Sequence, residues 1–103
     1  MSYSKVVAIL NISEYELISD ELTRLNVPGI SLSKVQGSGD YVNEYAHNGF
    51  SDSIKIEIYT VTEHAAEIAG VLSVLANDMT EGGGVVAIET VAELFNVKKL
   101  RNL

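Results

Sequence analysis

The sequence predicts an α+β domain in which a four-stranded antiparallel sheet carries two helices on one face. Three observations lead to this prediction. Apolar and polar residues alternate over residues 54–58, and this period of two is typical of a half-buried strand. Two other segments repeat apolar residues every three or four positions, as amphipathic helices do. The segments follow one another as strand, helix, strand, strand, helix, strand, which is the order of the split βαβ arrangement.

The composition fits one small domain spanning residues 1–103, because 47% of the residues are hydrophobic and can supply a single core. No apolar run approaches the length of a membrane span, and no small-residue cleavage site follows the N-terminal apolar run, so we expect no signal peptide. The chain has no cysteine, which excludes disulfides and thiolate metal sites. We expect a cytoplasmic protein.

The formal net charge is −7. Nucleic-acid binding depends on Lys and Arg that neutralise phosphates, so DNA and RNA are not expected as partners. A single phosphate group remains compatible with this charge, because backbone amides in one loop can bind it.

The first strand is expected at residues 5–12, whose nearly continuous aliphatic run predicts burial on both faces. Residues 13–16 form a capping box, and a helix follows to about residue 25. Its buried stripe is expected to consist of Ile18, Leu22 and Leu25. Pro28 and Gly29 end this segment.

The second strand, with Ile30, Leu32 and Val35 as its apolar face, is separated from the third by the polar, glycine-containing residues 37–53. The third strand carries alternating isoleucines at 54–58. Hairpin loops usually contain two to five residues. The insert is therefore either a functional element or a flexible loop without a function.

The second helix is expected from about Thr62 to residue 77. Its bulky contacts should be Ile68, Val71, Leu72 and Leu75, and its small residues, which allow a close approach to the sheet, are Ala66, Ala69, Gly70 and Ser73.

The last strand is expected at residues 85–88, after a run of three glycines. Thr90 and Glu93 have the spacing to cap a short turn, and residues 95–103 show little periodic signal. Together these elements predict a ferredoxin-like βαββαβ fold with a long loop between strands two and three. Tyr59, Val86 and Ile88 indicate an apolar uncovered face, which favours an oligomer.

Two glycine-rich segments, residues 37–39 and 82–84, could turn successive backbone amides toward a phosphate. The alternative is that each is only a turn that requires positive φ. Neither segment matches a Walker loop or a dinucleotide-binding fingerprint.

The runs KVQGSG, IKIEIYTV and GGGVVAIETVAELFNVKK resemble the nitrogen-regulatory PII signalling family over nearly the whole chain. The resemblance implies a ferredoxin-like fold, a compact trimer, and adenine nucleotides bound in clefts between subunits. It also implies that the insert, residues 38–52, is the mobile T-loop, which docks on a regulated transporter, enzyme or transcription regulator.

Carried over residue by residue, the resemblance implies two groups of site residues and no resident metal. The nucleotide-binding group is Ser31, Gly37, Ser38, Gly39, Glu57, Ile58, Tyr59, Gly82, Gly83, Gly84 and Lys98. The partner-docking group is Asp40, Tyr41, Asn43, Tyr45, His47 and Phe50.

This sequence departs from the family pattern at the charged positions. The family's Gly-Asp-Gly-Lys reads Gly82-Gly83-Gly84-Val85 here, and Asn96 and Lys98 replace two arginines. The loss of positive charge favours AMP, ADP or a cyclic nucleotide over ATP, or no nucleotide at all. Ser53 replaces a family lysine, so sensing of 2-oxoglutarate is not expected. The tyrosines at 41 and 45 lie outside the usual modification motif, so uridylylation is not expected either.

A different hypothesis is a metal site that combines His47 or His64 with nearby carboxylates across a trimer, as in CutA-like proteins of similar architecture. Two solvated histidines are favoured over this site, because neither histidine has another His, Asp or Glu four residues away to form an i, i+4 pair of ligands. No enzyme is expected. The sequence has no Ser/His/Asp order with a supporting motif, and the first loop lacks the arginine of acylphosphatases. An RNA-recognition module is not expected either, because the central strands lack its aromatic pairs.

Overall fold

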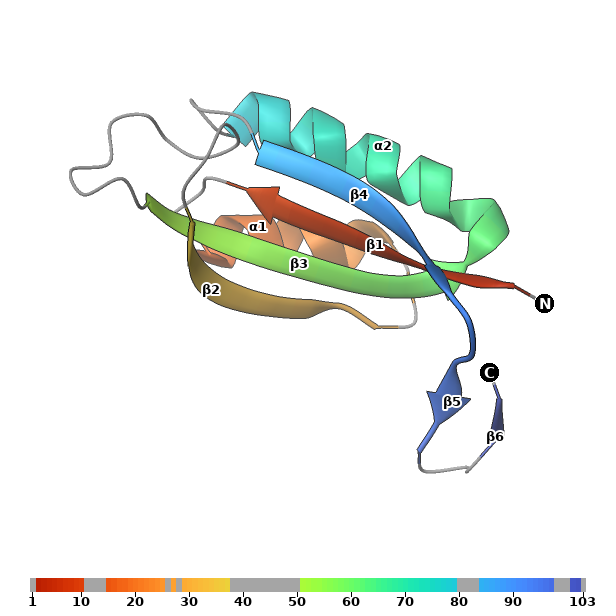
Figure 1. The fold of residues 1–103 in the computed structure, drawn as a ribbon. Helices are drawn as coiled ribbons and strands as arrows, with labels where there is room; N and C mark the ends of the chain where they lie inside the picture. The colour runs from red at the N-terminus through yellow and green to blue at the C-terminus, as the bar shows by residue number, and fades with distance from the viewer. Residues whose placement is uncertain are drawn as a thin grey trace.

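The computed structural model describes residues 2–10, 15–25, 27, 29–37, 51–79, 84–97 and 101–102. Two helices, one short 3-10 turn and six strands follow one another along the chain (Figure 1). They are β1 (Tyr3–Leu10), α1 (Tyr15–Leu22), η1 (Thr23–Leu25), β2 (Ser31–Gly37), β3 (Ser51–Val61), α2 (Thr62–Met79), β4 (Gly84–Val91), β5 (Phe95–Asn96) and β6 (Arg101–Asn102).

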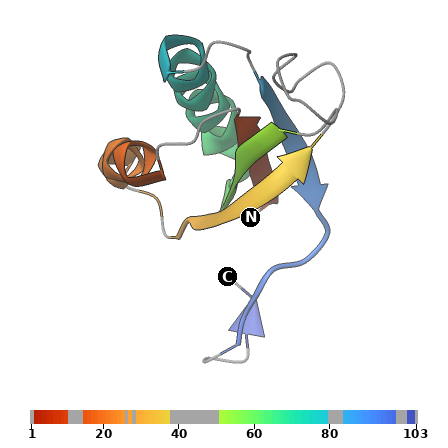
Figure 2. The ribbon, with the colours of Figure 1, turned by 90° about the vertical axis from the view of Figure 1, so that its left-hand side faces the viewer.

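The main sheet has the strand order β2-β3-β1-β4, and each neighbouring pair is antiparallel. Both helices lie on one side of this sheet, and the other side is left uncovered (Figure 2). The predicted α+β, ferredoxin-like fold is therefore confirmed. We call the side without helices the uncovered face.

Strand β1 is buried on one side only, which makes the expectation of burial on both faces wrong. Its even-numbered residues, Ser4 to Leu10, are buried under the helices, whereas its odd-numbered residues are half-buried on the uncovered face. A central strand with aliphatic residues on both sides therefore leaves half of them without a covering layer. The strand runs over Tyr3–Leu10, two residues earlier than expected.

The core lies between the sheet and the helices. Ile54, Ile56 and Ile58 are buried, as the alternation predicts, and Leu22 of α1 packs among them. Leu25 is partly buried against this cluster, and the side chain of Ile18 lies outside the described residues.

Helix α2 begins at Thr62, whose amide donates a hydrogen bond to the Ser2 carbonyl at 3.0 Å. Ile68 and Leu72 are buried as expected, but Val71 is 39% exposed, so its assignment to the core is wrong. The small residues turned toward the sheet are Ala65, Ala69 and Ala76. Of the expected small contacts, only Ala69 is among them, because Ala66, Gly70 and Ser73 lie on exposed sides of the helix.

The hairpin of β2 and β3 is longer than expected, because Gly37 still pairs with Ser51. The segment between the strands is therefore residues 38–50, not 37–53. Leu32 pairs with Ile56 and packs against the core, whereas Val35 pairs with Ser53 on the uncovered face. A separation of three residues in a strand puts two side chains on opposite faces, so the shared apolar face that we expected is wrong for Val35.

Strand β4 extends to Val91, and Thr90 belongs to this strand instead of starting a turn. Val86 and Ile88 pair with Ala8 and Val6, so they lie on the helix side and not on the uncovered face as expected. The uncovered face is nevertheless apolar, because other residues supply it. They are Tyr3, Val7, Ile9, Val35, Tyr59, Val61, Val85, Ala87 and Val91.

The two short strands β5 and β6 pair with each other in a separate hairpin that projects beyond the main sheet (Figures 1 and 2). Phe95 is 54% exposed and Val97 is 82% exposed. The radius of gyration, 14.5 Å, exceeds the value of about 13 Å expected for a compact chain of this length. No helix in the described part of the chain is both long enough and apolar enough to cross a bilayer.

Candidate functional site

The antiparallel order brings the described residue of each predicted glycine segment, Gly37 and Gly84, to one end of the sheet. Strands β1 and β2 both run antiparallel to β3, and β4 runs antiparallel to β1. Gly37, the last residue of β2, and Gly84, the first residue of β4, therefore lie at the same end but on opposite edge strands (Figure 1). Three spacings of about 4.8 Å separate these edges, roughly 14 Å in all, so the two glycines do not meet within one chain.

Gly84 has a packing role of its own. A Cβ at this position would lie 2.5 Å from the Ile9 carbonyl oxygen and 3.2 Å from the Leu10 Cα. Real Cβ atoms do not approach backbone so closely, so the contact between β4 and β1 requires glycine here. This requirement exists whether or not a ligand binds.

Four other predicted nucleotide contacts lie on β2 and β3. Ser31 and Glu57 are cross-strand partners on the uncovered face, and Tyr59 lies two residues further along β3. Six steps of about 3.3 Å separate Ser31 from Gly37, roughly 20 Å along β2. The side chain of Ile58 is fully buried in the core. Alternation therefore turns this side chain away from the face that carries Glu57, and the place of Ile58 in a nucleotide site stays a prediction.

The remaining site residues fall outside the residues that the structure describes. They are Ser38, Gly39, Gly82, Gly83 and Lys98 of the nucleotide-binding group, and Asp40, Tyr41, Asn43, Tyr45, His47 and Phe50 of the docking group.

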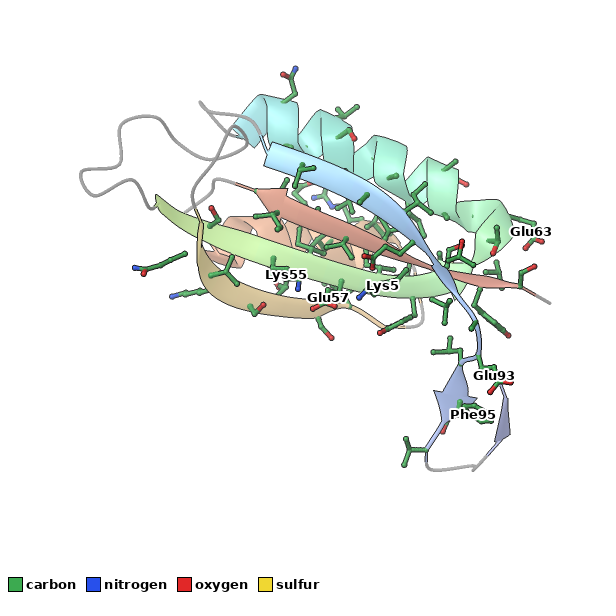
Figure 3. The ribbon with its side chains drawn as sticks, in the orientation of Figure 1. Lys5, Lys55, Glu57, Glu63, Glu93 and Phe95 are labelled. Carbon is green, nitrogen blue, oxygen red and sulfur yellow. The ribbon has the colours of Figure 1, made fainter. Side chains whose placement is uncertain are left out.

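A charged network that the sequence analysis missed crosses the middle of the uncovered face (Figure 3). The Lys5 Nζ lies 3.2 Å from the Glu89 Oε2 and 3.4 Å from the Glu57 Oε2, and so bridges β4, β1 and β3. The Lys55 Nζ lies 3.8 Å from the other oxygen of Glu57. Lys5 also lies 6.0 Å from the centre of the Tyr59 ring, within the range of a cation–π contact.

The network raises the pKa of Lys5 above its ordinary value. Its hydrogen bond to Glu89 is the largest cause and the bond to Glu57 adds to it, while desolvation acts in the opposite direction. The network contains two lysines and two glutamates, so its formal charge is zero. Glu57 contacts two ammonium groups, those of Lys5 and Lys55. A nucleotide that bound to Glu57 would therefore have to fit beside both of them.

Ser53 lies at the beginning of β3, next to the inserted segment. Ser53 is only 2% exposed, and its Oγ has no hydrogen-bond partner among the described residues. A buried hydroxyl without a partner is costly, by about 1–3 kcal/mol, and is therefore a candidate for ligand contact.

Metal ligands do not gather in the described part of the chain. The described residues contain no group of three or more His, Asp or Glu side chains placed to hold an ion. His64 lies in the first turn of α2, and His47 is outside the described residues.

A four-stranded ferredoxin-like sheet with a long insertion between β2 and β3, and with two glycine segments at the same end, defines a class of small α+β domains. Comparison with protein families identifies the group within this class. A profile described as "Nitrogen regulatory protein P-II" matches residues 3–101. The chain belongs to this family and is a regulatory signalling protein of the P-II type.

The structure is similar to a crystal structure of PII from Arabidopsis thaliana bound to citrate, with a TM-score of 0.77. The match covers 98% of this chain and 88% of the plant protein, at 20% sequence identity. A likeness at this identity establishes the fold alone. No curated protein sequence matches the chain significantly.

Proposed function

We propose that this chain forms a homotrimer, binds an adenine nucleotide in clefts between subunits, and controls a partner protein through the segment 38–50. In this proposal it acts in the cytoplasm and catalyses no reaction. The observation that carries the proposal is the position of Gly37 and Gly84 at one end of the sheet but on opposite edges.

The uncovered face supports an oligomer. Its residues Val7, Ile9, Val85 and Ala87 would be solvated in a monomer, whereas in an oligomer they would be buried against another copy. The zero formal charge of the Lys5 network suits such an interface, because a charge buried without a partner is strongly unfavourable.

A trimer gives the two glycine segments a way to meet. Each subunit would present the end of β2 on one edge and the beginning of β4 on the other. The β2 edge of one copy would then face the β4 edge of the next. Successive amides of the segments 37–39 and 82–84 could contact the same phosphate group from two subunits.

The charge of the segments bears on the choice of nucleotide. Lys98 replaces an arginine of the family pattern, and Val85 stands where the family has a lysine. We therefore propose AMP or ADP as the ligand in preference to ATP.

Control of the partner would follow from the insert. A ligand that binds better to one conformation of the segment 38–50 shifts the population toward that conformation. The partner, for which a membrane transporter is one candidate, would then bind only one of the two forms.

The alternative is a trimer that binds a metal ion or only a protein partner. To separate the two, we would measure the mass of the assembly by light scattering, then titrate it calorimetrically with AMP, ADP, ATP, cyclic AMP and divalent metals. The proposal expects a trimer and heat with AMP or ADP. Heat with metals and none with any nucleotide would select the alternative.

A matched pair of variants tests the position of the site. Gly83→Leu should abolish nucleotide binding and leave the trimer intact. Gly29→Leu is the control, because a Cβ at Gly29 meets nothing within 4 Å. Equal affinities of the two variants would overturn the assignment of residues 82–84.

A further inference from the structure

A groove runs along the outer side of the helix layer, between α1–η1 and α2. It consists of two hollows of about 240 Å³ and 620 Å³, and Glu67 and Val71 line both of them. Glu21 and Leu25 line the α1–η1 wall, and Val74 continues the α2 wall. We call it the helix-face groove. Because the helices cover only one side of the sheet, this groove stays accessible when the uncovered face is buried (Figure 2).

The α2 wall is formed by a stripe of residues that the core does not use. Glu67, Val71 and Val74 recur at intervals of four and three, so they share one side of the helix. Val71 is 39% exposed and Val74 is 63% exposed, whereas Ile68 and Leu72 on the neighbouring side are buried. The wall thus presents two branched apolar side chains to solvent.

Gly70 lies in the same wall and has no steric reason to be glycine within the described chain. A Cβ built at Gly70 meets nothing within 4 Å. Glycine in a helix interior costs about 1 kcal/mol relative to alanine. At this position it opens the wall, so that a neighbouring molecule can approach the helix backbone closely.

The groove is bordered by negative charge. Helix α2 contains no Lys or Arg, and Glu63 and Glu67 are exposed on it. On the opposite wall Glu21 lines the groove, and one of its oxygens lies 3.5 Å from a nitrogen of the exposed Arg24. His64 also lines the groove. The carboxylates that line the groove are therefore Glu67 on one wall and Glu21 on the other, and no Lys or Arg is among its described lining residues.

We propose that the helix-face groove binds an amphipathic helix of a partner protein, one that carries a row of apolar residues flanked by Lys or Arg. The apolar row would contact Val71 and Val74, and the cations would lie near Glu67 and Glu21. From His64 to Val74 the α2 wall is about 15 Å long, which matches about three turns of a bound helix. Three apolar anchors spaced by three or four residues would therefore fit.

Charge complementarity selects this occupant over a second copy of the chain. Two copies that met through their helix faces would bring like-charged carboxylates together, and the whole chain carries −7. None of the residues that line the groove belongs to the segment 38–50 or to the proposed nucleotide contacts. The groove would give the protein a second docking surface that does not require the ligand.

The probe is a synthetic helical peptide of about 14 residues, roughly four turns, with Leu on one side and Lys on the other. A second peptide has the same Leu positions but Glu in place of every Lys. Binding to the full chain is measured by fluorescence anisotropy. We expect the Lys peptide to bind at least about tenfold more tightly than the Glu peptide.

Two variants locate the site. Val74→Lys places a positive charge in the groove and should lower the affinity for the Lys peptide at least about tenfold. Ser73→Lys makes the same change of charge one residue away, outside the groove. It should lower the affinity for the Lys peptide less than about twofold. Circular dichroism checks that both variants fold, which the exposure of both side chains favours.

Three outcomes would overturn the proposal. Equal weakening by the two variants would mean that only the net charge of the protein attracts the peptide. Equal binding of the Lys and Glu peptides would remove the argument from charge. Concentration-dependent self-association of the chain that Val74→Lys abolishes would assign the groove to a second copy.

Discussion

The ammonium group of Lys5 lies 3.2 Å from the carboxylate of Glu89, across the boundary between β1 and β4. A second contact, to Glu57 at 3.4 Å, extends the link to β3. Three of the four strands of the main sheet are thus joined by one side chain in the middle of an otherwise apolar face. In the proposed trimer this face would be an interface.

The Lys5 network predicts a pH dependence of stability. Because the folded-state pKa of Lys5 is raised, its contribution is fully present below the unfolded value of 10.5 and is lost as the pH rises through the raised value. We expect the difference in urea midpoint between the natural chain and Lys5→Met to be constant from neutral pH to about pH 9.5 and to shrink above about pH 10.5. A difference that vanished already at neutral pH would contradict the network.

The uncovered face predicts the effect of neighbouring substitutions in β4. Ala87 lies on this face opposite Val7, and Ile88 lies on the helix side, 49% exposed. If the proposed trimer forms through this face, Ala87→Arg should convert it to a folded monomer, and Ile88→Arg should leave the assembly unchanged. Analytical ultracentrifugation measures both. If both variants remained assembled, another surface would hold the subunits together.

The close contact of Gly84 predicts a loss of stability. Gly84→Ala would place a Cβ against the Ile9 carbonyl oxygen and should destabilise the fold by about 1–3 kcal/mol, the usual cost of overpacking. Gly29→Ala, where a Cβ meets nothing within 4 Å, should change stability by less than about 0.5 kcal/mol. Urea unfolding gives both values. If Gly84→Ala left the free energy of unfolding unchanged, β4 would be able to move away from β1.

Adjacent residues of α2 predict contrasting costs. Leu72 is fully buried, so Leu72→Ala should destabilise the protein by about 2–5 kcal/mol. Val71→Ala should cost less than about 1 kcal/mol, because Val71 lines the helix-face groove and not the core. Thermal or urea unfolding separates the two. Similar costs would mean that the groove closes around Val71.

The unpartnered hydroxyl of Ser53 predicts a variant that is not destabilised. Ser53→Ala removes a buried oxygen that has no hydrogen bond to any described residue, so stability should stay constant or rise by about 1 kcal/mol. Urea unfolding without ligand is the measurement. A loss of more than about 1 kcal/mol would indicate that the hydroxyl has a partner in solution.

Local periodicity in the sequence was sufficient to predict the helices and strands and the fold class. The alternation of Ile54, Ile56 and Ile58 and the helical spacing of Ile68 and Leu72 predicted the correct buried residues. Each pattern depends on near neighbours in the chain, which fix whether a side chain points to one side or the other. The glycine-bounded insert was also visible, although β2 and β3 reach further into it than the polar composition suggested.

Sequence periodicity predicted the candidate site less well than the fold. Ile58 belongs to the predicted nucleotide-binding group, but alternation with Glu57 turns its side chain into the core, so whether it contacts a ligand stays a prediction. Val86 and Ile88 were assigned to the uncovered face, where Val85 and Ala87 in fact lie. A shift of one residue in the pairing of a strand exchanges its two faces, and composition alone does not fix that register when both faces are apolar.

The sequence by itself determined the order of strands and helices, the position of the insert and the family resemblance, because these depend on residues close together in the chain. Only the tertiary structure decided that Lys5 would lie between Glu57 and Glu89, that Gly37 and Gly84 would occupy opposite edges of one sheet end, and that α1–η1 and α2 would leave a groove between them. Those relationships join residues far apart in sequence. They are set by the antiparallel pairing of the strands and by the packing of the helices on one face, and no local pattern encodes them.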